Sequence, residues 1–82
     1  MKTETKIAEE RIDEIKLFEK DGKRDVEGRA EAIGIKQSCQ RFLEFLLFLD
    51  NNYDVPHVIL QDIKRKITDL KNAIKKYDEA GI

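Results

Sequence analysis

Cys39 and His57 are the only cysteine and the only histidine of this 82-residue chain, and they are the side chains best suited to covalent chemistry. A thiol becomes an effective nucleophile when a base such as histidine lies beside it. The helices expected around these residues place them well apart along the helix axis, so we expect no Cys–His pair. One cysteine and one histidine also cannot build a metal site or an internal disulfide. The sequence therefore predicts no catalytic residue, metal or cofactor, and a protein that is not an enzyme.

A second group of residues suits the recognition of DNA bases, because glutamine pairs with adenine and arginine with guanine in the major groove. These residues belong to a stretch, residues 30–43, that resembles the core of the helix-turn-helix DNA-binding motif. Ala30, Gly34 and Ile35 match the small residue, the turn glycine and the aliphatic residue of that family, and Leu43 suits a buried position. The resemblance implies a recognition helix that reads DNA through Gln37, Ser38, Gln40 and Arg41.

The same stretch also fits a continuous helix. Gln40 stands where the family has a branched aliphatic residue, and only Lys36 and Arg41 are available to hold phosphates. Gly28 and Gly34 would then lie inside the helix and allow a close approach of the first helix, at about 1 kcal/mol each relative to alanine. The apolar seam is unbroken from Gly28 to Leu49, which favours the continuous helix.

Three stretches have apolar residues at helical spacing, and we predict helices over residues 5–20, 26–49 and 55–79. The apolar residues of the second and third stretches alternate at spacings of three and four, the pattern of a helix packed along one seam. Asp25 is a suitable N-cap, and Pro56 fits a first helical turn. No strand pattern is present. We predict one all-α domain, residues 1–82, in which a short first helix packs on a long helical hairpin as an antiparallel three-helix bundle.

The most unusual feature is the segment Phe42–Leu49, which has seven apolar residues of eight in a chain that is 40% charged. The first helix is about 24 Å long and the others about 36 Å. An antiparallel first helix therefore stops near Arg41, and the third helix covers only one side of the segment. We assign Phe42, Leu46 and Leu49 to the seam within the chain. The surplus apolar residues, which we predict to contact another chain, are Leu43, Phe45, Leu47 and Phe48.

Burial of a Phe or Leu side chain is worth about 1.5–3 kcal/mol, so four uncovered ones favour association. We therefore predict a homodimer, or a higher oligomer, centred on residues 42–49. The alternative is a compact monomer in which the first helix kinks or packs across the segment.

The charges favour a protein-binding function over a general nucleic-acid or membrane function. The 16 basic and 17 acidic residues nearly cancel, which gives no overall attraction to anionic polymers or lipids. The third helix is basic and the first is acidic, so we expect ion pairs between them. The sequence shows neither a signal peptide nor a membrane-spanning stretch, and the single cysteine suits a reducing compartment, so we expect a cytoplasmic protein.

These features predict a small non-catalytic protein that acts by protein–protein interaction, as a homo-oligomeric adaptor or inhibitor. Small charged helical proteins are common on phages and mobile elements, so one hypothesis is an inhibitor of a host system. The expected partners are a second copy of the chain and an unidentified protein. The alternative is a helix-turn-helix transcription regulator that binds DNA through residues 37–41.

Overall fold

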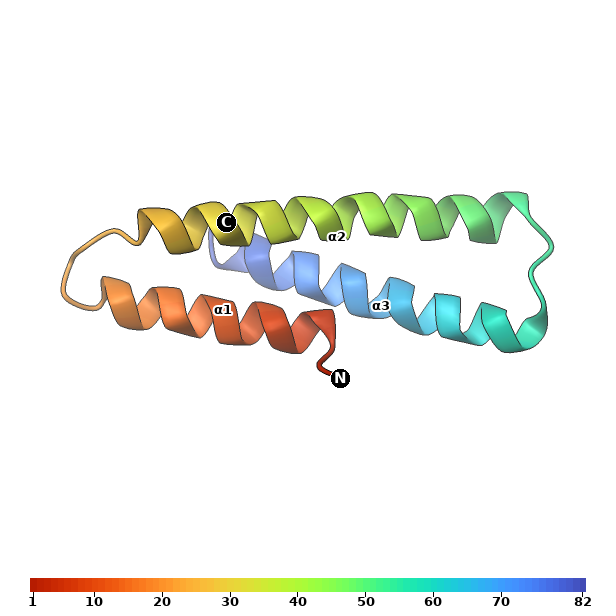
Figure 1. Cartoon of the computed structure of the whole chain (residues 1–82), viewed down its shortest axis with the longest axis horizontal. Helices are drawn as coiled ribbons and strands as arrows, with labels where there is room; N and C mark the ends of the chain where they lie inside the picture. The colour runs from red at the N-terminus through yellow and green to blue at the C-terminus, as the bar shows by residue number, and fades with distance from the viewer.

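The computed structural model describes all 82 residues and contains three helices, α1 (Glu4–Glu19), α2 (Val26–Asn52) and α3 (His57–Glu79). They form a rod of 52 × 20 × 18 Å. α2 runs along the whole rod, and α1 and α3 both lie antiparallel to it (Figure 1). The predicted all-α three-helix bundle is confirmed. The helix ends differ slightly, because α2 continues to Asn52 and α3 begins only after Pro56.

Side-chain caps fix where the first two helices begin. The hydroxyl of Thr3 accepts a hydrogen bond from the backbone N–H of Lys6 at 3.1 Å, and the carboxylate of Asp25 accepts one from Gly28 at 3.0 Å. Each cap satisfies a backbone donor that the first turn of a helix leaves free. Gly22 has a φ of +86°, so a glycine makes the turn between α1 and α2. The predicted N-cap at Asp25 is confirmed.

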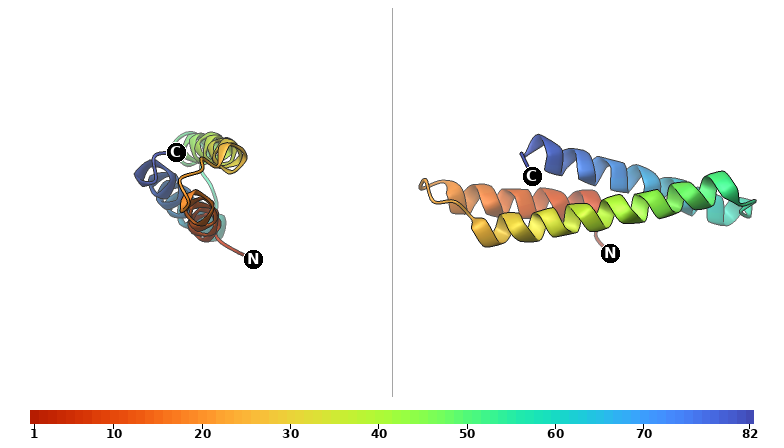
Figure 2. Two further views of the ribbon diagram at one scale, coloured as in Figure 1. Left: turned by 90° about the vertical axis from the view of Figure 1, so that its left-hand side faces the viewer. Right: turned by 90° about the horizontal axis from the view of Figure 1, so that it is seen from above.

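The core is unequal along the rod. At one end all three helices contribute to a cluster of six buried residues: Ala8, Ile12, Ile15, Ala32, Ala73 and Tyr77. Further along, α2 and α3 alone bury four: Cys39, Leu46, Ile67 and Leu70. Seen from above, α1 lies beside only one half of the α2–α3 hairpin (Figure 2). The other half is a two-helix structure with no third helix over it.

Two expectations about α1 need correction. A Cβ atom added at Gly34 would meet nothing within 4 Å, so this glycine does not allow a close approach of α1. Phe18, three residues after the buried Ile15, is itself 54% exposed. α1 is a single helix that neither kinks nor crosses residues 42–49 (Figure 1). The kink or crossing of the first helix that the compact-monomer alternative requires is therefore absent.

Candidate protein-interaction surface

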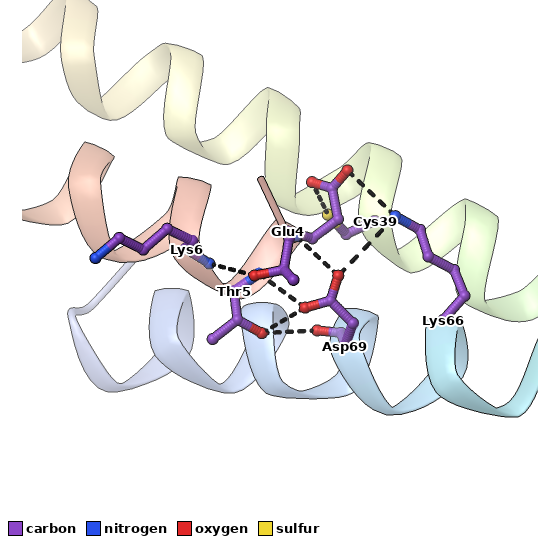
Figure 3. A network of polar contacts seen from close by, with 7 residues as sticks. Glu4, Thr5, Lys6, Cys39, Lys66 and Asp69 are labelled. Atoms are coloured by element: carbon purple, nitrogen blue, oxygen red, sulfur yellow. Dashed lines mark hydrogen bonds and ion pairs between the residues drawn. The ribbon is translucent and has the colours of Figure 1, made fainter. Parts of the chain in front are cut away.

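Asp69 of α3 holds the beginning of α1 in place. Its carboxylate accepts hydrogen bonds from the backbone N–H groups of Glu4 at 2.8 Å and Thr5 at 3.0 Å. The hydroxyl of Thr5 donates to the same carboxylate at 2.7 Å. Figure 3 shows these contacts between the first turn of α1 and the middle of α3. A carboxylate from another helix thus does the work of an N-terminal cap, and it fixes α1 at half the length of the hairpin.

The charge of Asp69 is stabilised by the groups that it binds. Partial burial raises the pKa of this carboxyl, but the hydroxyl and amide of Thr5, the amide of Glu4 and the ammonium of Lys66 together bring it below its ordinary value. Lys66 Nζ also lies 3.7 Å from the carboxylate of Glu4. At its first turn, α1 is therefore joined to α3 by a network of charged hydrogen bonds, whereas the apolar contacts between the two helices lie further along α1.

Cys39 lies beside the same network, but it is poorly suited to catalysis. Its thiol is buried and donates a weak hydrogen bond to the Glu4 carboxylate at 3.8 Å. Burial, followed by the charge of Glu4, raises the pKa of this thiol to about 11, so it stays protonated near neutral pH. His57 is exposed in the first turn of α3 and contacts Gln61 at 3.2 Å. The two residues make no contact with each other.

Beyond the N-terminus of α1, apolar side chains are concentrated at the surface. The chain has eleven exposed large apolar residues, and six of them fall within the 18 positions from 42 to 59. We call these six the apolar patch: Phe42, Phe45, Phe48, Tyr53, Val58 and Ile59. Monomeric proteins rarely leave large apolar areas in contact with water, so this concentration is a candidate interaction surface.

Helical geometry explains which side chains of the segment 42–49 are exposed. Lys36 pairs with Asp78 of α3, and Leu43 and Leu47 follow Lys36 by seven and eleven residues, so they lie on the flank of α2 that faces α3. Glu31 pairs with Arg11 of α1 at 2.7 Å, and the residues eleven and fourteen positions later lie on the flank that faces α1. Those residues are Phe42 and Phe45, and α1 has ended before it reaches them.

The four predicted contact residues therefore separate into two pairs. Phe45 and Phe48 are 55% and 52% exposed, whereas Leu43 and Leu47 are half-buried against the α2–α3 core. Phe42, assigned from the sequence to the internal seam, is 43% exposed and belongs to the patch. That the four predicted residues contact another chain stays a prediction.

Residues of α3 complete the patch. Ile59 precedes Lys66 by seven residues, so it lies on the flank of α3 that contacts Glu4 of α1. Ile59 therefore faces the space beyond the N-terminus of α1, as Phe42 and Phe45 do. The sequence analysis did not identify Val58 and Ile59 as exposed apolar residues. The available signal is that both are apolar and stand just before the seam of α3 instead of within it.

Three of the aromatic rings in the patch make specific contacts. Phe48 packs edge-on against Tyr53, with 5.8 Å between ring centroids and 67° between the ring planes. At the other end, Lys66 Nζ lies 5.8 Å from the centroid of Phe42, which is a cation–π contact. Phe42, Phe45 and Phe48 are spaced by three residues, so neighbouring rings are adjacent and the three form a stripe that winds around α2 by about 60° at each step.

A groove between α1 and α2 leads into the patch. It has a volume of about 680 Å³, and its lining includes Gly34, Ser38 and Phe42. The groove stays open because Gly34 has no side chain and Ser38 has a short one. Exposed small residues followed by Phe42 make a path along α2 that another helix could approach closely.

The structure does not contain the helix-turn-helix motif that residues 30–43 resemble. α2 is continuous through Gly34, so the turn that the motif requires is absent. Gln37, Ser38 and Arg41 are exposed and Gln40 is half-buried along this one helix. Without a turn there is no separate recognition helix that could enter the major groove in the manner of that family. DNA binding by these side chains stays a prediction that this arrangement does not support.

Charged residues join the helices as expected. Glu9 and Glu4 of α1 pair with Lys76 and Lys66 of α3 at 4.0 and 3.7 Å. Between α1 and α2, Arg29 donates two hydrogen bonds of 2.7 Å to the carboxylate of Glu19. Part of the basic character of α3 is thus balanced within the chain by α1.

No group of three histidine, cysteine, aspartate or glutamate residues is arranged to hold a metal ion. None of the helices has both the length and the apolar character that crossing a lipid bilayer requires. Comparisons with protein families, curated proteins and solved structures gave no match. The apolar patch and the groove beside it are therefore the features on which a functional proposal rests.

Proposed function

We propose that this protein is a non-catalytic interaction module that acts by presenting the apolar patch to other protein chains. Its partners are a second copy of itself and a further protein, so that it serves as an adaptor or an inhibitor in the cytoplasm. Inhibition of a host system by a phage or mobile-element protein is one role of this type. Nothing in this role needs a cofactor or a metal.

The observation that supports the proposal is the stripe of Phe42, Phe45 and Phe48 beyond the end of α1. Each of these rings is about half exposed, and covering them removes apolar surface worth roughly 25 cal/mol per Å² from water. Aromatic side chains are also the residues that contribute most to protein interfaces. A helix that presents three of them in a row is suited to binding another helix.

Site-specific photocrosslinking tests the proposal in the cell of origin. The chain would carry benzoylphenylalanine in place of Phe45, and a matched control would carry it in place of Leu17, which is exposed at the other end of the rod. We expect covalent adducts with protein chains from position 45 and few from position 17. The masses of the adducts separate a second copy from a different protein. If position 45 gave no more adduct than position 17, the patch would not be the interaction surface.

The helix-turn-helix alternative makes a separate prediction. If the chain were a DNA reader, a gel shift against genomic DNA would show specific binding at physiological salt, and Gln37→Ala or Arg41→Ala would abolish it. We expect no specific shift, because α2 has no turn at Gly34.

A further inference from the structure

The half of the hairpin that α1 leaves uncovered is shaped to receive its own copy. α1 begins at Glu4, which contacts Cys39, so residues 40–52 of α2 extend beyond it. At 1.5 Å per residue this length is about 20 Å. Two packed helices bury only the residues between them and leave their flanks exposed, whereas four helices can enclose a larger core. A second hairpin laid against the first supplies the two missing helices over the same 20 Å.

The ends of α1 determine how far two hairpins can overlap. In an antiparallel pair, the tip of each hairpin, residues 50–56, slides toward the other chain until it meets the N-terminus of α1. A shorter overlap leaves Phe42 exposed, and a longer one is blocked by α1. The uncovered half is therefore both the binding site and the segment that fills it, as a two-fold interface requires.

The charges on this half also favour an antiparallel pair. Asp50 and Asp54 lie at the tip, and neither forms an ion pair within the chain. Arg41, also without an ion pair, lies near the N-terminus of α1, whereas Lys66 beside it is paired with Glu4 and Asp69. An antiparallel arrangement brings the acidic tip of each copy to Arg41 of the other. A parallel arrangement places acidic tip against acidic tip, which costs free energy.

The exposed aromatic rings supply part of the area that a specific contact needs. Phe42, Phe45, Phe48 and Tyr53 are each about half exposed. At 150–250 Å² for a whole aromatic side chain, they offer roughly 400 Å² per copy, about half of the ~800 Å² that each partner contributes to a standard interface. Val58 and Ile59 and the flanking backbone extend this surface.

We propose that two copies bind antiparallel through the uncovered halves of their α2–α3 hairpins, forming a four-helix centre with a three-helix arm at each end. This inference rests on the proposed function, because it uses the same apolar patch. To the second copy named there, the inference adds the orientation and the register of the two chains. The centre of the overlap lies near Leu46 of each chain. The open end in Figure 1, where only α2 and α3 run, becomes the middle of a longer rod.

Distance measurement between spin labels tests the orientation. The full chain would carry Ala30→Cys with Cys39→Ala, and circular dichroism would confirm that it is still helical. Ala30 is exposed and lies 16 residues from the centre of the overlap. The antiparallel pair therefore predicts a nitroxide separation of about 50 Å in double electron–electron resonance. A separation below 25 Å would indicate a parallel pair and overturn the inference, while the proposed function would stand. A monomer without any such distance would overturn the inference and the self-association part of the proposed function.

A charge exchange tests the register independently. Asp54→Lys and Arg41→Asp should each weaken self-association by roughly fivefold, as expected for charges at the rim of an interface. The double variant should recover most of the loss, because the exchanged charges still meet across the interface. Additive losses in the double variant would show that Arg41 and Asp54 of two copies do not meet.

Discussion

The carboxylate of Asp69 on α3 binds the backbone N–H groups of Glu4 and Thr5, and this contact sets the position along α3 at which the beginning of α1 is held. Backbone donors in the first turn of a helix need an acceptor, and a negative charge there is also favoured by the helix dipole. One polar side chain in the middle of α3 thus sets the length of hairpin that α1 covers. The apolar patch begins directly beyond it.

Removal of this acceptor should destabilise the bundle. Asp69→Ala leaves the two N–H groups and the Thr5 hydroxyl without their partner, so we expect a loss of about 1–3 kcal/mol in the free energy of unfolding. Asn72→Ala is a suitable control, because Asn72 is exposed on the next turn of α3, and its effect should stay within about 0.5 kcal/mol. Urea unfolding followed by circular dichroism measures both. Equal effects of the two substitutions would show that Asp69 does not anchor α1.

The two interior glycines of α2 should respond differently to alanine. A Cβ at Gly34 meets nothing within 4 Å, so Gly34→Ala should stabilise the monomer by up to about 1 kcal/mol through helix propensity. A Cβ at Gly28 would lie 2.2 Å from the present position of the Asp25 carboxylate, so Gly28→Ala displaces the N-cap and should gain less or lose stability. Thermal unfolding of both variants measures the difference. A larger gain for Gly28→Ala would contradict the cap geometry.

Glu19 should make stability depend on pH in the acid range. Its hydrogen bonds with Arg29 and with the backbone N–H of Asp25 lower the pKa of this carboxyl from 4.5 to about 2. A pKa that is lower in the folded state adds stability above the unfolded value, and the contribution is lost as the pH falls from about 4.5 towards 2. Glu19→Gln should therefore reduce the change of the melting temperature with pH over this range. Glu14→Gln, at an exposed residue without an ion pair, should leave the pH profile unchanged.

Cys39 should react slowly with thiol reagents. Its pKa is raised from 9.0 to about 11, so below pH 9 about one-hundredth of the usual thiolate is present, and burial limits access further. Ser38→Cys with Cys39→Ser places a thiol on the exposed neighbouring position as a control. The rate of labelling at pH 8 should be at least a hundredfold lower for Cys39 than for the control. Equal rates would mean that the α2–α3 core opens readily at this point.

Much of this architecture follows from the sequence, because the spacing of Leu60, Ile63, Ile67 and Leu70 allows only a helix with one buried side. The length of the first helix also shows that it stops near Arg41, and Glu4 does lie beside Cys39. The rotation of α2 about its own axis was harder to predict. The spacing of the seam alone does not show which flank of α2 faces α1 and which faces α3. For this reason the sequence analysis assigns Phe42 to the seam within the chain, and Leu43 and Leu47 to the contact with another chain.

The anchoring role of Asp69 was not predicted either. It depends on a contact between residues 65 positions apart in the chain, and an aspartate on a charged helix face has no local signal that marks it as a cap. The ion pairs between α1 and α3 were easier to predict, because each helix has an excess of one charge. Opposite charges on neighbouring helices are a pattern that the sequence displays directly.

Sedimentation equilibrium over a series of concentrations tests the central claim, that the apolar patch joins two chains. At tens of micromolar the protein should sediment as a dimer of the 9.6 kDa chain. Phe45→Glu with Phe48→Glu should sediment as a monomer with its helices intact by circular dichroism, and Leu17→Glu should remain a dimer. A wild-type protein that stays at 9.6 kDa throughout would contradict the claim, and so would a double variant that unfolds instead of dissociating.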